Sequence, residues 1–225
     1  MKTALVLFGQ PRFAELTYNY WYKNLIEIMD CDVFFHTWWS KDMVGTQYPS
    51  RARSVLWDED MLVTEGILDK LVELYKPIDY KYDGYEEFPL FKTNQYQYYT
   101  QLAASGIIRR TGNTKTYDCI IRSRFDLAVG QDVEFNVDDN VWVASCCPYT
   151  DGRINDMFSI SNYENFIKIS ETFNNLKEFE EQGRGEMEWA LYSQIQKENL
   201  TIRKFHADYD TFDIVRSTTK EKYVV

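Results

Sequence analysis

Three charged side chains stand at the end of an apolar run in the segment YDCIIRSRFDLAVG. Arg122, Arg124 and Asp126 are each two residues apart, and we expect them to share one face of a strand because strand side chains alternate. One buried carboxylate cannot balance two guanidinium groups, so an outside anion is expected. A diphosphate with Mg²⁺ or Mn²⁺ fits, because guanidinium groups bind phosphate oxygens and a carboxylate binds the ion. The alternative is an internal salt-bridge network with Asp118 or Asp151.

A second polar segment, FGQPR, follows the first apolar run of the chain. Gly9 allows a ligand to approach the backbone closely, and Arg12 falls in the first turn of an expected helix, where N–H donors face outward. We therefore expect Phe8, Gly9, Gln10 and Arg12 to contribute to a ligand site at the end of this strand. The spacing is not G-x-G-x-x-G, so a dinucleotide is not indicated. An ordinary strand-to-helix turn is the alternative.

The two histidines suggest different roles. His36, in FFHTWW, is either a core histidine that is hydrogen-bonded to the backbone or a contact to a nucleobase or phosphate. His206 is the better metal candidate, because Asp208, Asp210 and Asp213 follow it. A solvated histidine beside acids is the alternative for His206.

The segment DGRINDMF supplies candidates for acceptor chemistry. A carboxylate in this segment, Asp151 or Asp156, is a candidate general base for an acceptor hydroxyl, a role that needs hydrogen-bond reach and a moderately raised pKa. Asp151 and Asn155 are predicted to contact the acceptor, and Glu186 and Glu188 are rival candidates for the base.

Short apolar runs and helical periodicity predict the elements that position these residues. Apolar runs at 3–8 and 31–39, separated by a helical pattern at 13–30, predict a βαβ unit and a parallel sheet. Further strands are expected at 78–85, 117–129, 140–146 and 153–161. Helices are expected at 64–76, 91–110, 161–176 and 186–198. A loop is expected at 40–60, and a strand followed by a loop at 200–216. Ligands bind at the carboxyl ends of such strands, where the polar segments would converge.

Composition bounds the class of protein. The 225 residues favour one domain spanning 1–225. A net charge of −10, without a dense basic run, makes nucleic acid an unexpected partner. The 16% aromatic content favours a flat or sugar-like ligand, or aromatic side chains that cover seams between helices and the sheet. Four cysteines fit neither a zinc site nor a disulfide framework, and the absence of a signal peptide or membrane span predicts a cytoplasmic protein.

With these motifs, the chain resembles small glycosyltransferases of the GT-A type, which act on nucleotide sugars with a single Rossmann-like domain. The resemblance is closest to short enzymes of large algal viruses and to bacterial lipopolysaccharide-synthesis transferases. Its basis is LVLFGQPR, DVFFHTW, YDCIIRSRFDL and INDMFSISNYENF, which in order and spacing cover most of residues 1–170. The fold that this implies is α/β, with a mostly parallel central sheet flanked by helices.

The resemblance also implies a reaction. A sugar would move from a nucleoside-diphosphate sugar, for instance a UDP-sugar, to a hydroxyl of a glycan or glycoprotein, with Mn²⁺ or Mg²⁺ on the diphosphate. The nucleotide sugar would lie over the end of the first strand, at Phe8, Gly9, Gln10 and Arg12. The region around Asp156 matches the acceptor-side segment of the family, which makes Asp156 the expected base if the enzyme inverts.

Where the family carries Asp-x-Asp, this chain has Arg124-Phe125-Asp126, so only Asp126 carries over as a metal ligand, and His206 matches a C-terminal histidine that can complete the site. The alternatives are a nucleotidyltransferase acting on a sugar phosphate and a glycan-binding module without catalysis.

Overall fold

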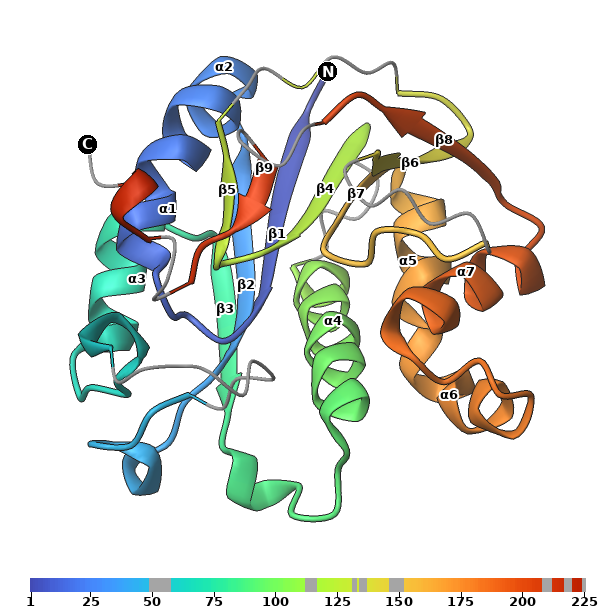
Figure 1. The fold of residues 1–225 in the computed structure, drawn as a ribbon. Helices are drawn as coiled ribbons and strands as arrows, with labels where there is room; N and C mark the ends of the chain where they lie inside the picture. The colour runs from blue at the N-terminus through green and yellow to red at the C-terminus, as the bar shows by residue number, and fades with distance from the viewer. Residues whose placement is uncertain are drawn as a thin grey trace.

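The computed structural model describes residues 1–48, 58–111, 117–130, 133, 137–145, 152–207, 212–216 and 220–223. Seven strands form one sheet, ordered β3-β2-β1-β4-β7-β6-β8 (Figure 1). Their bounds are Asp79–Asp83, Asp32–Trp38, Thr3–Gly9, Cys119–Arg124, Phe158–Ser161, Asn140–Ala144 and Thr201–Phe205 in that order. In this sheet only β7 runs antiparallel to its neighbours, so the predicted α/β class with a mostly parallel sheet is confirmed.

Strand register brings the polar segments together at one edge. In β1, Phe8 lies opposite His36 of β2 and Arg124 of β4, while Gly9 lies opposite Thr37. Because the three strands are parallel, their carboxyl ends and the segments that follow them share this edge of the sheet.

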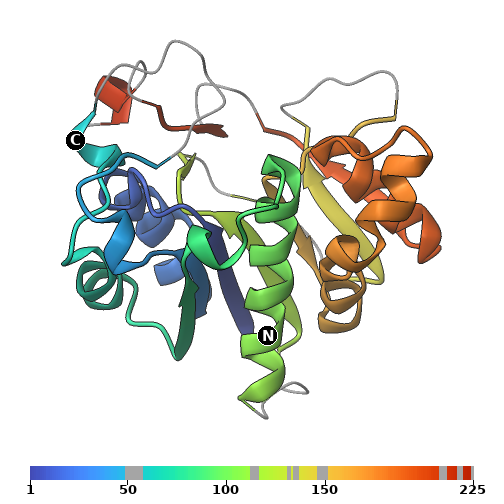
Figure 2. The ribbon, with the colours of Figure 1, turned by 90° about the horizontal axis from the view of Figure 1, so that it is seen from below.

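Helices cover both faces of β1, β2 and β4 (Figures 1 and 2). On one face lie α1 (Ala14–Trp21), a π-helical turn (Tyr22–Ile26), α2 (Glu27–Met29) and α3 (Ile67–Tyr75). They pack on strand residues that include Leu5, Leu7, Phe35 and Ile121. On the other face α4 (Thr93–Arg110) packs on Val6, Phe34 and Ile120 through Ala104, Ile107 and Ile108. The alternation along β4 therefore turns Arg122 towards α4.

The remaining helices pack around β6. These are α5 (Tyr163–Ser170), α6 (Thr172–Glu181) and α7 (Met187–Lys197). Val141 and Val143 of β6 pack with Ile169, Leu176 and Leu191, one residue from each of the three helices. Tyr98 of α4 joins the same cluster, so α4 packs both on β1, β2 and β4 and on the cluster around β6.

The strand predicted at 117–129 is interrupted. Strand β4 ends at Arg124, the chain turns at Phe125–Asp126, and β5 (Leu127–Val129) pairs with β9 (Phe212–Ile214) in a separate two-stranded sheet. The buried ring of Phe125 packs against Phe35. Strand alternation was expected to place Asp126 on the same face as Arg124. The strand ends at Arg124, so the turn that follows sets the position of Asp126 instead. The tail, predicted as a loop beyond its first strand, supplies β9.

Other boundaries also differ from the predictions. Within 153–161 only β7 is a strand, and the helix predicted to follow divides into α5 and α6. The N-cap of α5 is Asn162, whose side chain accepts from the backbone N–H of Asn165. The loop predicted at 40–60 carries two 3₁₀ turns, Lys41–Met43 and Glu59–Met61.

Candidate functional site

The carboxylate of Asp126 is held between two arginines. Arg124 binds it with two nitrogens, Nε at 2.8 Å and Nη2 at 2.7 Å, and Arg12 donates from Nε at 2.7 Å. The Asp126 side chain is 2% exposed, whereas Arg12 and Arg124 are 12% and 19% exposed. Burial acts to raise the pKa of Asp126, but the two guanidinium charges outweigh it and lower that pKa. Two cations therefore share one anion at the edge of the sheet, with their outer faces towards solvent.

Arg122 is a buried cation with neutral hydrogen-bond partners. Its nitrogens donate to Ser159 Oγ at 3.0 Å, to Gln101 Oε1, and to the main-chain oxygen of Asp156 at 3.0 Å. Burial lowers the pKa of Arg122 to about 10, so it stays charged at neutral pH. The guanidinium also lies 5.5 Å from the centre of the Phe8 ring. Arg122 is only 1% exposed, and its role in nucleotide-sugar binding stays a prediction.

Asp156 lies beside this cation. Its carboxylate accepts a hydrogen bond from Gln97 of α4, and the residue is 5% exposed. Burial raises the pKa of Asp156, and the charge of Glu188 raises it further, while Arg124, Gln97 and Arg122 act in the opposite direction. A raised pKa is the property expected of a general base. Glu188, one rival candidate, is thus a neighbour of Asp156.

The segment after β1 is held in an unusual backbone conformation. Gly9 has φ +98° and Phe13 has φ +56°, so two left-handed residues bracket Arg12. A Cβ on Gly9 would meet no atom within 4 Å, so conformation rather than lack of space accounts for the glycine. The side-chain amide of Gln10 donates to the hydroxyl of Tyr85 at 2.7 Å. Arg12 thus lies between two residues of left-handed backbone, and its Nε donates to Asp126.

His36 is enclosed rather than facing a ligand. The residue is 0% exposed, with Nδ1 2.5 Å from Thr100 Oγ1 and Nε2 2.9 Å from Asp83 Oδ2. Burial lowers the pKa of His36, although its contact with Asp83 acts to raise it, so the ring is neutral at pH 7. The predicted direct contact with a nucleotide is corrected on this point, because both ring nitrogens are already engaged within the protein. The structure therefore agrees with the core-histidine alternative, although the partners are side chains rather than backbone.

Thr100 connects His36 to the segment that follows β1. The backbone N–H of Gly9 donates to Thr100 Oγ1 at 3.2 Å, and Thr37 Oγ1 donates to the carbonyl of Gly9 at 2.9 Å. Both backbone groups of Gly9 are thereby fixed. Hydrogen bonds through Thr100 thus connect His36 to Gly9 and the segment that carries Arg12.

The residues predicted for the acceptor and the metal are only partly placed. Asn155 is 1% exposed and its side chain accepts from the backbone N–H of Met157 at 2.8 Å, so it shapes the turn before β7. Asp151 lies outside the described residues. His206 is exposed at the end of β8, and Asp208 lies outside the described residues. Asp210 and the side chain of Asp213 also lie outside them.

The described residues do not form a ready metal site. Among them, no group of three His, Cys, Asp or Glu side chains could hold an ion. Both oxygens of Asp126 already accept from guanidinium groups, so an ion would reach this carboxylate only after an arginine left it. Metal ligation by Asp126 and His206 stays a prediction.

Three residues of the site were missed by the sequence analysis. Tyr85 stacks on Trp38 at 4.8 Å between ring centres, and it lies close enough for the charges of Arg12 and Arg124 to act on its pKa, which burial raises overall. Gln97 and Gln101 bind Asp156 and Arg122 from α4. Their spacing of four residues, one turn of a helix, is the only signal in the sequence that they share a face.

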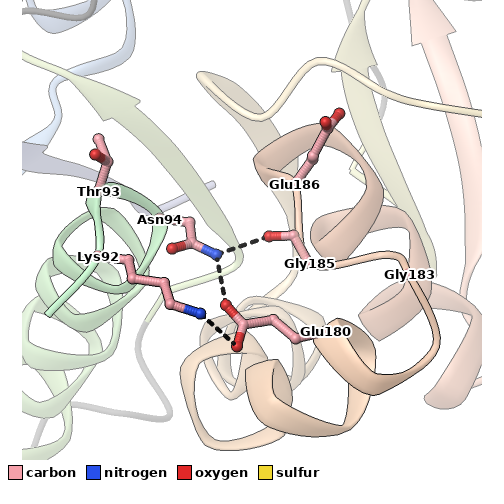
Figure 3. Close-up of a pocket in the computed structure, with 7 residues that line it drawn as sticks. All are labelled: Lys92, Thr93, Asn94, Glu180, Gly183, Gly185 and Glu186. Atoms are coloured by element: carbon pink, nitrogen blue, oxygen red, sulfur yellow. Dashed lines mark hydrogen bonds and ion pairs between the residues drawn. The ribbon is translucent and has the colours of Figure 1, made fainter.

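A pocket of about 420 Å³ opens beside the start of α4 (Figure 3). It lies between α4 and the connection from α6 to α7, and its lining residues are Lys92, Thr93, Asn94, Glu180, Gly183, Gly185 and Glu186. Glu186, the second rival candidate for the base, therefore belongs to this pocket.

No family model matches the sequence, and no curated protein matches it. Among solved structures, the chain is similar to the crystal structure of the glycosyltransferase GlyE in Streptococcus pneumoniae TIGR4, with 12% sequence identity and a TM-score of 0.47. The match covers 93% of this chain and 46% of that chain, so the chain spans about half the length of the protein it matches. The resemblance to viral and lipopolysaccharide-synthesis enzymes stays a prediction. None of the described helices is long and apolar enough to cross a membrane.

Proposed function

We propose that the chain is a glycosyltransferase that moves a sugar from a nucleoside-diphosphate sugar to a hydroxyl of a glycan or glycoprotein. The observation that carries the proposal is the sharing of Asp126 by Arg12 and Arg124 at the carboxyl edge of the sheet. A guanidinium group has five N–H donors, and the contacts among the described residues use one on Arg12 and two on Arg124. The donors that remain match the oxygens of a diphosphate.

The arginines would act on the leaving group. Attack by the acceptor hydroxyl on the anomeric carbon breaks the bond from that carbon to the diphosphate oxygen, which leaves with the electron pair. Negative charge therefore grows on the diphosphate, and fixed cations stabilise it where it appears. Arg12 and Arg124 would bind the diphosphate directly, and Arg122 would add its field from beneath Phe8.

Asp156 would take the proton of the acceptor hydroxyl. Its raised pKa suits a base, and the hydrogen bond from Gln97 orients the carboxylate. Attack from the face opposite the leaving group would invert the configuration of the sugar. Asn155 would hold the turn that positions Asp156.

A divalent ion is a separate part of the proposal. Bound Mn²⁺ or Mg²⁺ would neutralise charge on the diphosphate. Chelation by EDTA followed by readdition of Mn²⁺ tests it. Loss and recovery of transfer would support an ion, whereas unchanged transfer would assign charge stabilisation to the arginines.

Thermal-shift measurements with a ligand panel test the reaction class. We expect nucleoside diphosphates such as UDP and GDP to raise the melting temperature of the protein. The double variant R12Q/R124Q should lose this shift. Stabilisation by nucleoside triphosphates alone would instead favour a nucleotidyltransferase, and stabilisation by free sugars alone a glycan-binding module. Release of nucleoside diphosphate from a nucleotide sugar then measures transfer.

A further inference from the structure

The pocket at the start of α4 is polar and partly preorganised. The side-chain amide of Asn94 donates to the carbonyl of Gly185 at 2.8 Å and to Glu180 Oε1 at 3.2 Å (Figure 3). Lys92 reaches the other oxygen of Glu180 at 3.4 Å. The side chains of Lys92 and Glu180 are 70% and 28% exposed, so solvent or a ligand can reach this ion pair. The pocket thus presents oriented donors and acceptors of the kind that bind hydroxyl groups.

Glycines shape the wall of the pocket opposite α4. A Cβ on Gly185 would lie 2.4 Å from Glu180 Cγ and 3.2 Å from Glu180 Cα, so a larger residue would displace Glu180. Gly183 has φ +72°, which side-chain-bearing residues rarely adopt. The hydroxyl of Tyr98 donates to the main-chain oxygen of Met187, which ties the start of α7 to α4. The connection between α6 and α7 is therefore fixed beside Asn94.

One face of α4 leads from this pocket to the proposed base. Asn94, Gln97 and Gln101 stand at positions i, i+3 and i+7, which fall on the same side of a helix. Gln97 binds Asp156 and Gln101 binds Arg122. Asn94 is one helical turn before Gln97, a rise of about 5 Å. The pocket and the proposed base, which is itself 5% exposed, thus lie about one helical turn apart along the same face of α4.

We infer that this pocket is the acceptor subsite and that it takes a neutral, hydroxyl-rich glycan unit. The inference rests on the proposed function and names the acceptor class. Two carboxylates, Glu180 and Glu186, and one ammonium group, Lys92, line the pocket, so the local charge disfavours uronic or sialic acids. The volume of about 420 Å³ accommodates one or two sugar rings. Hydroxyls would exchange with the hydrogen bonds that Asn94 now makes.

A printed oligosaccharide array tests the inference, with the variant Asn94→Ala and the matched control Asn24→Ala. Asn24 also uses its amide to bind a main-chain oxygen, that of Val129, but it lies on the π-helical turn, away from the pocket. We expect wild type to bind neutral oligosaccharides and not uronic acid-containing ones. Asn94→Ala should weaken that binding about tenfold, which is a loss of about 1.4 kcal/mol. Asn24→Ala should bind as wild type does.

Parallel thermal shifts with UDP and GDP separate this inference from the proposed function. We expect the nucleotide shift to be unchanged in Asn94→Ala, because Asn94 does not contact the arginines. Equal array binding by Asn94→Ala and wild type would overturn the subsite, as would nucleotide binding by a wild type that binds no neutral oligosaccharide. If array binding depends on Asn94 but no nucleotide stabilises the protein, the pocket would remain a glycan site and the proposed transferase activity would be wrong.

Discussion

Two buried polar networks flank the end of β1, and they differ in charge balance and exposure. In the first, His36 is 0% exposed and Asp83, 6% exposed, accepts from His36, Lys81 and Tyr99. Its one anion is matched by one cation, and the histidine is neutral. In the second, Asp126 is shared by Arg12 and Arg124, whose side chains remain partly exposed. We call the first network closed because His36 and Asp83 are buried, although Lys81, whose side chain is 41% exposed, reaches solvent. We call the second open because two partly exposed cations share one buried carboxylate, with Asp156 as a further acid that acts on Arg124.

The two networks are therefore suited to different roles, the closed one to supporting the fold and the open one to binding a ligand. A closed network meets all its own hydrogen-bonding needs, so it serves as a support. An open network is left with donors for a ligand. Gly9 lies between the two, because its N–H is fixed by Thr100 on the His36 side and its chain continues to Arg12 on the Asp126 side. The support thus positions the ligand-binding group.

The largest effect on transfer is expected for Arg124→Gln in the open network. Removing a cation that stabilises the leaving diphosphate should lower the rate of transfer about 10²–10³-fold. Asp126 keeps Arg12 as a partner, so the fold should survive. The matched control is Arg109→Gln, which loses only a surface ion pair with Glu171. Initial rates of nucleoside diphosphate release measure both, and an Arg124→Gln enzyme as fast as the control would remove the arginines from the reaction.

Asp156→Asn tests the base beside the same network. We expect a loss of about 10²-fold in transfer, because the amide cannot accept the proton. The pKa of Asp156 is raised, so wild-type transfer should increase as pH rises through that pKa and the carboxylate ionises. The variant should lose this acid limb of the pH profile. If the variant keeps the fall in transfer rate at low pH, another group must be the one that ionises, and Glu188 is the first candidate.

His36→Asn perturbs the closed network and should affect stability more than transfer. The folded pKa of His36 lies below the ordinary value near 6.5, so the unfolded chain binds the extra proton first. The stability that His36 contributes is therefore full above about pH 6.5 and is lost as pH falls towards the folded pKa. Asp83, Lys81 and Glu87 are the charged groups that act on the ring.

Urea unfolding at several pH values measures this change. Wild type should lose unfolding free energy as pH falls below about 6.5, and His36→Asn should lack that slope. At pH 7.5 we expect the variant to be about 1–3 kcal/mol less stable, since Asp83 and Thr100 lose a partner. Affinity for UDP or GDP should change less than transfer does in Arg124→Gln. A larger loss of affinity than of stability would mean that His36 takes part in binding.

The strands and their ends were largely predictable from the sequence, whereas the side-chain partners of His36 were not. The apolar runs around Leu5 and Phe34 predict buried parallel strands, and parallel strands place the residues that follow them at one edge. The placement of Gly9 beside Thr37 and of Phe8 beside Arg124 follows from that topology.

The contacts of the open network could not be predicted from the sequence in this way. Arg12 and Asp126 are 114 residues apart, and their contact depends on the turn after Arg124, which strand periodicity did not predict. Gln97 reaches Asp156 from another element, through a helix rotation that is fixed only when α4 packs on the sheet. Local patterns predict elements and their buried faces, whereas the partners of a charged side chain depend on tertiary packing.

Thr100→Val, which cuts the connection between the two networks, should have the smallest effect. The change keeps the shape of the side chain but removes the acceptor for the Gly9 N–H and the hydroxyl beside His36. It should cost about 1 kcal/mol of unfolding free energy. Thr37 still holds the Gly9 carbonyl, so we expect Arg12 to be less well positioned rather than lost. The KM for the nucleotide sugar should rise about fivefold, the effect of about 1 kcal/mol on binding, with kcat little changed. The control is Thr111→Val at the end of the same helix, where the hydroxyl donates to the carbonyl of Ile108. A rise of KM in Thr111→Val equal to that in Thr100→Val would mean that the rise does not come from the connection between the two networks.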